Sequence, residues 1–186
     1  MKFYLSSFRL GDKSAELVRL MPENKKIAYI PNANDYTNVD LDRKIKWERL
    51  DIDSLEKIGL TVEYLDLRNY FDKTDDLRKK LSGFGGVFIR GGSAFVLRQA
   101  MKLSGFDIIF KELLKREDFV YSGYSAGICV LAPDFKAIQI VDDASDWPYK
   151  ELQETIWEGL GYLDYMILPH YKSNHPESAD IDKEVE

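Results

Sequence analysis

The chain has 186 residues, of which 45% are hydrophobic and 31% are charged, and its net charge is −6. This is the composition of a soluble globular protein with one core. The negative balance argues against a nucleic-acid partner, because phosphate recognition needs clustered Lys and Arg side chains. A single cysteine, Cys129, excludes an intramolecular disulfide and fits a reducing compartment. Neither a signal peptide nor a membrane span is predicted, so we expect a cytoplasmic protein with no membrane partner, either monomeric or homodimeric.

Short apolar runs alternate along the chain with segments of helical periodicity. We expect strands over residues 2–8, 26–31, 60–67, 85–90, 119–121, 137–141 and 165–169. We expect helices over residues 12–20, 39–58, 75–81, 94–102, 106–115, 126–132 and 153–159. The acidic residues after Pro176 fit either a helix or a frayed end. Strands that alternate with helices predict one α/β domain over residues 1–186, with a mostly parallel sheet and helices on both of its faces.

Residues 118–132 carry the clearest chemical signal. An apolar strand passes through Gly123-Tyr124-Ser125-Ala126-Gly127 into a run of small apolar residues. Serine at the apex of a strand-to-helix turn, with a glycine two residues to either side, is typical of the G-x-S-x-G nucleophile elbow. The glycines are needed because a Cβ at either position would collide with the neighbouring strand or helix. The turn would expose the Ser125 hydroxyl and place the Ala126 amide at a helix N-terminus, where it could stabilise an oxyanion.

A serine nucleophile needs a base within hydrogen-bond reach, and the chain has only two histidines. His170 directly follows the expected strand 165–169, at the carboxyl end of a strand where parallel sheets gather their ligands. It is therefore the favoured base. His175 lies in Ser-Asn-His-Pro, which predicts an exposed loop. The pair Gly91-Gly92 ends the strand 85–90, where it either supplies an oxyanion donor or only permits a tight turn into the next helix.

The remaining reactive residues do not indicate a second site. Cys129 lies among apolar residues of the expected helix and is predicted to be buried. The glycine pair lacks the spacing and the lysine of a phosphate-binding loop. The histidines lack further ligands at usable spacing, so we expect no metal ion and no cofactor.

Taken together, these motifs resemble those of the peptidase E (α-aspartyl dipeptidase) family of serine peptidases, whose fold is related to that of class I glutamine amidotransferases. The resemblance covers most of the chain in order. It is carried by the N-terminal strand, Ile30-Pro31-Asn32-Ala33, Arg90-Gly91-Gly92-Ser93-Ala94-Phe95, Gly-Tyr-Ser-Ala-Gly and Leu168-Pro169-His170-Tyr171. The family loop commonly reads Gly-Gly-Asn-Thr-Phe and the family elbow G-x-S-A-G. The resemblance implies hydrolysis of a small peptide substrate, with N-terminal aspartate as the preferred residue.

By this resemblance, Ser125 would be the nucleophile and His170 the general base. The amides of Ala126 and of Gly91 or Gly92 would form the oxyanion hole, and water would resolve an acyl-enzyme. The third member of the triad is open: Asp142 is the first choice, with Asp143 and Asp146 as alternatives. Some family members have instead been assigned a glutamate well after the histidine, but Glu177 and Glu184 follow His170 too closely for a confident match.

Two departures from the family pattern bear on the function. Ser93-Ala94 replaces Asn-Thr, which affects the expected aspartyl specificity, and the chain ends sooner than is usual in the family, as a truncated or short relative would. Arg90 is a candidate cation for an aspartyl side chain, although a surface arginine paired with a nearby acid is the favoured interpretation. The alternatives to a peptidase are a non-catalytic small-molecule-binding or regulatory protein on the same fold, and an α/β-hydrolase esterase.

Overall fold

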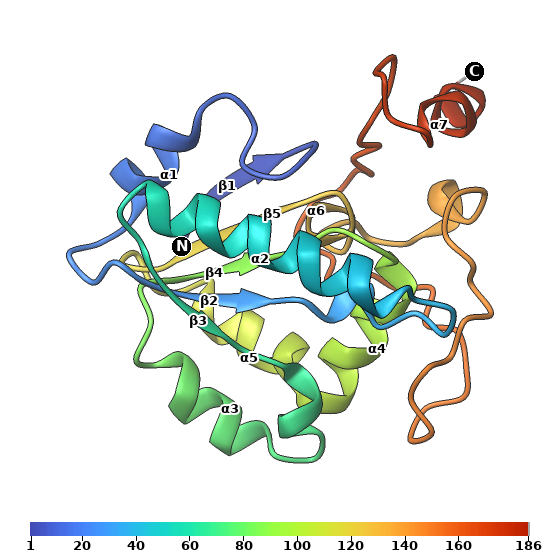
Figure 1. Ribbon diagram of the computed structural model, residues 1–186. Helices are drawn as coiled ribbons and strands as arrows, with labels where there is room; N and C mark the ends of the chain where they lie inside the picture. The colour runs from blue at the N-terminus through green and yellow to red at the C-terminus, as the bar shows by residue number, and fades with distance from the viewer. Residues whose placement is uncertain (186) are drawn as a thin grey trace.

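The computed structural model describes residues 1–185, and the side chains of residues 1–182. Its centre is a sheet of five strands in the order β1-β5-β4-β2-β3, and every adjacent pair is parallel (Figure 1). The strands are β1 Lys2–Ser6, β2 Lys26–Ile30, β3 Thr61–Tyr64, β4 Gly86–Ile89 and β5 Val120–Tyr124. The predicted class is confirmed: this is an α/β fold of the class I glutamine amidotransferase-like type, with the turn after β5 in its centre.

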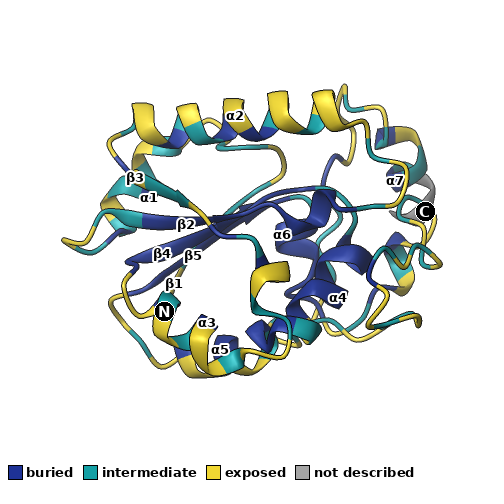
Figure 2. Ribbon diagram, turned by 60° about the horizontal axis from the view of Figure 1, so that its bottom comes forward, coloured by how far each residue is buried: buried dark blue, intermediate teal, exposed yellow. Residues whose placement is uncertain are grey.

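Helices cover both faces of the sheet. The described α-helices are α1 Ser14–Leu20, α2 Leu41–Lys57, α3 Thr74–Leu81, α4 Ala94–Ser104, α5 Phe106–Leu113, α6 Ala126–Cys129 and α7 Ser178–Val185. Helices α1 and α2 lie on one face, and α3, α4 and α5 lie on the other (Figures 1 and 2). No helix in the described part of the chain combines the length and the apolar character that crossing a bilayer requires.

Each face of the sheet buries its own apolar cluster. The smaller one joins Leu17 of α1 and Leu55 of α2 to Tyr29 and Phe88 of the sheet. The larger one packs α3, α4 and α5 against the other face of β4 and β5, and it extends under the segment that follows α6. Strands β4 and β5 are buried along their whole length, which is why their sequences are mostly apolar, and the buried hydroxyl of Ser122 in β5 donates to the Val87 carbonyl.

Local sequence signals fix the helix ends that border the functional edge of the sheet. Asp40 caps α2 by accepting a hydrogen bond from the amide of Arg43, and Ser93 caps α4 by accepting one from the amide of Val96. Gly105 ends α4 in the left-handed conformation that glycine adopts without strain. These caps set the start of both helices beside the carboxyl ends of the strands.

Three predicted elements in the C-terminal third are wrong. Residues 137–141 form part of a 3₁₀ turn, Lys136–Ile138, and its continuation, in place of a strand. Residues 153–159 are irregular in place of helical, and the amide of Phe135 bonds the carbonyl of Trp157. Residues 165–169 form no strand. In this last segment Met166 and Leu168 pack against the larger core, so the apolar run reflects burial alone, which periodicity cannot distinguish from pairing in a sheet.

Candidate active site

The turn after β5 is the sharp strand-to-helix turn that the sequence predicts. Ser125 stands between β5 and α6 with φ +49° and ψ −120°, a conformation that costs energy for any residue with a Cβ. Both flanking glycines are required by space. A Cβ on Gly123 would lie 2.7 Å from the carbonyl oxygen of Ile89, and one on Gly127 would lie 2.4 Å from the same atom. The predicted collision is therefore with the backbone of β4.

His170 reaches the serine from a different part of the chain. Its Nε2 lies 3.3 Å from Ser125 Oγ, and the residue is 5% exposed. The backbone amide of His170 donates to Ser7 Oγ, just beyond β1, at 3.0 Å. The hydroxyl of Ser173 donates to the His170 carbonyl oxygen at 2.7 Å, and His170 itself has φ +69°. The loop is thus anchored at the end of β1, so the position expected for His170 is reached without the strand expected before it.

Burial sets the protonation state of His170. Loss of solvent, together with a smaller contribution from the neighbouring His175, lowers the pKa of this imidazole to about 4. The ring is therefore neutral at neutral pH. A neutral imidazole can accept a hydroxyl proton, which is the property that a base beside a serine requires.

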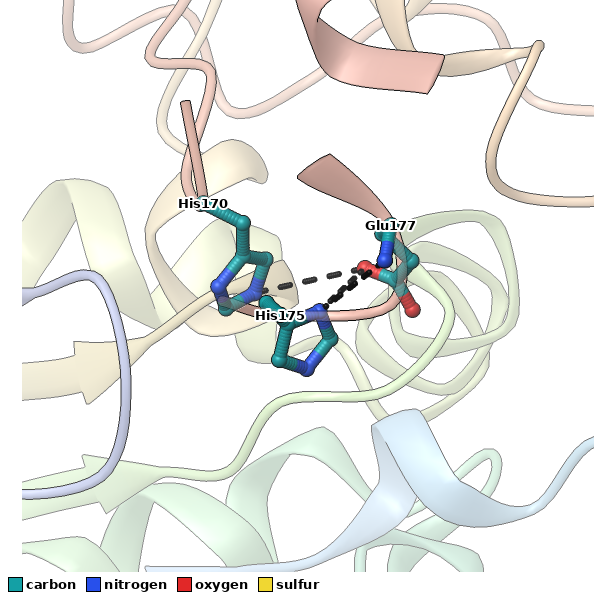
Figure 3. A group of neighbouring side chains, drawn as sticks. All are labelled: His170, His175 and Glu177. Carbon is teal, nitrogen blue, oxygen red and sulfur yellow. Dashed lines mark hydrogen bonds and ion pairs between the residues drawn. The ribbon is translucent and has the colours of Figure 1, made fainter. Parts of the chain in front are cut away.

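His175 and Glu177 lie against His170, although the sequence places His175 in an exposed loop. The two imidazole rings stack with centroids 3.8 Å apart and planes 13° apart. Glu177 Oε2 lies 4.0 Å from His170 Nε2 and 3.7 Å from His175 Nδ1, as Figure 3 shows. Burial raises the pKa of the Glu177 carboxyl. The expectation that the histidines lack a further ligand is wrong, because a turn at Pro176 folds Glu177 back onto both of them.

The Gly91-Gly92 loop passes directly beside Ser125. Gly92 has φ +147°, and a Cβ there would lie 2.2 Å from the carbonyl oxygen of Ala33, while one on Gly91 would lie 2.9 Å from the Cβ of Ser125. No acceptor within residues 1–185 bonds the amides of Gly91, Gly92 or Ala126. The loop and the start of α6 therefore offer unpaired N–H groups near the serine.

None of the three candidate aspartates contacts His170 among the described residues. Asp142 Oδ2 accepts a hydrogen bond from the amide of Ala94, the first residue of α4, at 2.7 Å. Asp143 accepts from the amide and hydroxyl of Ser145, and Asp146 accepts from the amide of Thr37. Asp142 thus tethers the glycine loop, and its assignment to a triad stays a prediction. Glu184 lies outside the residues whose side chains are described.

Ser125 and its neighbouring groups line a cleft of about 560 Å³ at the carboxyl edge of the sheet. Ser125, His170 and the glycine loop lie on one side of the cleft wall, and residues of α2 with the loop before it contribute another part. Four cationic side chains line it, which are Arg9, Arg43, Lys44 and Arg90. Only Arg90 is predicted from the sequence, because nothing local in α2 distinguishes Arg43 or Lys44 from ordinary solvent-facing residues of an amphipathic helix.

Two buried carboxylates hold most of these cations in place. Asp51 pairs with Arg9 at 2.8 Å, and its other oxygen lies 3.4 Å from Arg90 Nε. Asp35 pairs with Lys44. Arg90 pairs with an acid, as one interpretation of the sequence expected. Because the residue is only 8% exposed, the pair lies inside the protein and not on its surface. Arg43 is exposed and has no ion pair among the described residues.

Residues 9–184 match the family model of peptidase family S51. The chain belongs to this family. It is 28% identical over 152 residues to an uncharacterized peptidase of Listeria monocytogenes serovar 1/2a, covering 81% of this chain and 68% of that one. It is 29% identical over 152 residues to an uncharacterized peptidase of Listeria innocua serovar 6a, covering 81% and 66%.

Solved structures agree with this membership. The crystal structure of a candidate peptidase E protein from Listeria monocytogenes EGD-e matches all of this chain and 86% of its own, with a TM-score of 0.75 and 26% identity. A peptidase from an acI-B1 actinobacterium has a TM-score of 0.62 over 96% of this chain and 73% of its own; at 14% identity it supports the fold alone. The S51 family confirms the predicted resemblance to the peptidase E family and supports a serine peptidase. The esterase alternative no longer applies.

We expect Gly127→Ala to destabilise the fold by about 1–3 kcal/mol, because the new methyl group overlaps the backbone of β4 and cannot move away. Gly83→Ala is the matched control, since its Cβ would meet nothing closer than 3.5 Å. Its effect should stay within about 0.5 kcal/mol. Urea denaturation of both variants gives the two values, and equal stabilities would contradict the close packing at Gly127.

Burial raises the pKa of Asp142 to about 7, above its value of about 4 in an unfolded chain. The folded protein therefore binds this proton more tightly, and the stability that it contributes is lost as the pH rises through 7. Asp142→Asn keeps an oxygen for the Ala94 amide without the charge. We expect this variant to gain at most about 2–3 kcal/mol over the wild type between pH 5 and 8, reduced by solvent contact at the half-buried carboxyl.

Asp143→Asn is the control for this measurement. Hydrogen bonds from Ser145 lower the pKa of the Asp143 carboxyl, so this variant should not gain stability as the pH rises. Denaturant midpoints at several pH values would decide the matter. A difference between Asp142→Asn and the wild type that stays constant from pH 5 to 8 would show that Asp142 is ionised throughout.

Proposed function

We propose that this chain is a serine peptidase that hydrolyses dipeptides or short peptides through an acyl-enzyme. One observation carries the proposal. Ser125 Oγ lies 3.3 Å from the ring of a buried neutral histidine, inside a cleft, on a turn whose backbone is held in a strained conformation. A strained backbone conformation at a cleft-lining serine is typical of a nucleophile. Such a conformation costs free energy and persists only where the surrounding packing enforces it, and residues of this kind are concentrated at active sites.

In the proposed reaction, Ser125 Oγ attacks the peptide carbonyl carbon while its proton passes to His170 Nε2. The tetrahedral adduct then expels the amine of the scissile bond, which takes that proton from His170. Water attacks the resulting ester, again giving a proton to His170, and the serine hydroxyl is restored as the acid leaves. Each step uses the one imidazole nitrogen that faces the serine.

The amides of Ala126 and of the Gly91-Gly92 loop are the proposed donors to the oxyanion. They have no competing acceptor in residues 1–185, and Ala126 opens a helix beside the serine. Asp142 would assist by fixing the start of α4 through the Ala94 amide, which holds the glycine loop in register with the serine. Donors held in advance lose no free energy to reorganisation as charge develops.

A preference for N-terminal aspartate is the finer part of the proposal, and the charges of the cleft support it. Asp51 and Asp35 offset Arg9 and Lys44. Arg43 enters the cleft from α2 without an ion pair among the described residues, so its charge is available to a carboxylate of the substrate. A substrate side chain with a carboxylate would be favoured over its amide or alanine counterpart.

Ser125→Ala and His170→Ala should each lower kcat/KM on a cleaved dipeptide by at least about 1000-fold, because each removes one partner of the proton transfer. Ser82→Ala, at an exposed serine after α3, is the matched control and should retain activity. The measurement is the rate of hydrolysis of dipeptides with Asp, Glu, Ala or Leu at the N-terminus, monitored as the release of free amine. Turnover that survives in both variants would overturn the proposed mechanism.

Arg43→Gln should reduce the ratio of kcat/KM for Asp-Leu over Ala-Leu by about 10-fold, the loss expected for one partly exposed charge pair with the substrate. Arg49→Gln tests a cation on the same helix that instead pairs with Asp53. It should leave the ratio unchanged. An equal ratio in the wild type and Arg43→Gln would assign the preference, if present, to another group.

A non-catalytic binding protein on the same fold is the second candidate. It is favoured by the absence, among the described residues, of a carboxylate bonded to the far nitrogen of His170, where a triad acid would orient the ring. The dipeptide panel separates the two. Folded wild-type protein that binds a dipeptide in calorimetry and never cleaves it would support this candidate.

A further inference from the structure

We propose that His170, His175 and Glu177 form a binding site for a divalent transition-metal ion, with Zn²⁺ as the best match. One ligand atom from each residue lies within 4.8 Å of the other two. Both ring nitrogens face the same carboxylate oxygen, Glu177 Oε2, at 4.0 and 3.7 Å (Figure 3).

The donor set is one that Zn²⁺ prefers. Two imidazoles and one carboxylate are the protein ligands of a zinc site that keeps its fourth position open. All three residues line the cleft, so an ion would enter from solvent and water could complete its tetrahedron. Two of the three ligand atoms are imidazole nitrogens, which suit Zn²⁺ and other transition-metal ions better than Mg²⁺ or Ca²⁺, the ions that prefer oxygen ligands.

Only a small movement is needed to reach bonding geometry. Ligand atoms around tetrahedral Zn²⁺ stand about 3.3 Å apart when the bonds are about 2.0 Å long. The two contacts of Glu177 exceed this separation by about 0.7 and 0.4 Å, and the two ring nitrogens exceed it by at most about 1.5 Å, which is roughly within the reach of side-chain rotation. The stacked rings must tilt, and His175 can do so because its side chain is 27% exposed on a loop.

The site is also local in the chain. The three ligands lie within residues 170–177, and hydrogen bonds already shape this loop. Ser173 Oγ donates to the His170 carbonyl and accepts from the His175 amide at 3.2 Å. The amide of Glu177 donates to His175 Nδ1 at 3.3 Å, and an ion bound at this nitrogen would replace that hydrogen bond, because one lone pair cannot serve both. Closing so short a loop around an ion orders little additional backbone.

Metal binding would compete with Ser125 for His170. The lone pair of His170 Nε2 accepts either the serine proton or the ion, and an occupied site would leave the serine without its base. Zn²⁺ would thus inhibit hydrolysis reversibly. This consequence rests on the proposed function, whereas the binding of the ion does not.

The test is titration of EDTA-treated, dialysed protein with ZnCl₂ in a calorimeter, with the visible spectrum of added Co²⁺ as a second readout. We expect one ion per chain for the wild type. His175→Gln and Glu177→Gln should each weaken binding at least about 10-fold, since each removes a ligand. Glu154→Gln, at an exposed acid outside the cluster, is the matched control and should bind like the wild type.

Ser125→Ala separates the two proposals, because it should retain Zn²⁺ binding whether or not the protein is a peptidase. If the wild type cleaves dipeptides, Zn²⁺ should inhibit it. The Zn²⁺ concentration for half inhibition should be at least about 10-fold higher in His175→Gln than in the wild type, with the activity of each protein expressed as a fraction of its own rate without Zn²⁺. No uptake by the folded wild type, or equal affinity in His175→Gln, Glu177→Gln and Glu154→Gln, would overturn the metal site.

Discussion

The close approach of the turn after β5 to the end of β4 is the constraint on which the site depends. Gly123 and Gly127 both pass the carbonyl of Ile89 at a distance that leaves no room for a side chain. The buried hydroxyl of Tyr121 donates to the Gly127 carbonyl at 2.6 Å and holds the turn from beneath. With both sides of the turn pressed against the sheet, Ser125 must adopt a positive φ, and its hydroxyl is directed into the cleft.

A buried carboxylate links this turn to the opposite wall of the cleft. Asp51 of α2 accepts hydrogen bonds from Arg9, from Tyr29 of β2 and from Tyr124, the residue before the serine. A charge removed from water is tolerated only when such partners surround it, so the network strongly specifies where α2 lies. The same helix carries Arg43 into the cleft. One buried carboxylate therefore connects the helix that carries Arg43 to the residue that precedes the serine.

The segment that carries both histidines obeys different rules. Between residues 163 and 177 the described chain forms no helix or strand, and polar contacts with β1 and within the loop position it. His170 is held by the Ser7 hydroxyl, and His175 and Glu177 are held mainly against His170 itself. A base placed in this way can exchange partners at little structural cost, and the competition that we propose between a serine and a metal ion depends on this property.

The sequence by itself determined the alternation of strands and helices over the first two thirds of the chain and the serine turn, because each depends on neighbours in the chain. The apolar runs of β4 and β5 and the glycines around Ser125 are local signals of this kind. The sequence indicated His170 through a strand that does not form, and only the tertiary structure placed this histidine beside the serine. The tertiary structure alone decided which acids approach the site. Asp142 binds the Ala94 amide in place of the imidazole, and Glu177 folds back onto two histidines. It also decided that residues 165–169 pack without pairing in the sheet. Carboxylate partners and edge pairing are set by contacts between distant segments, and no local pattern records them.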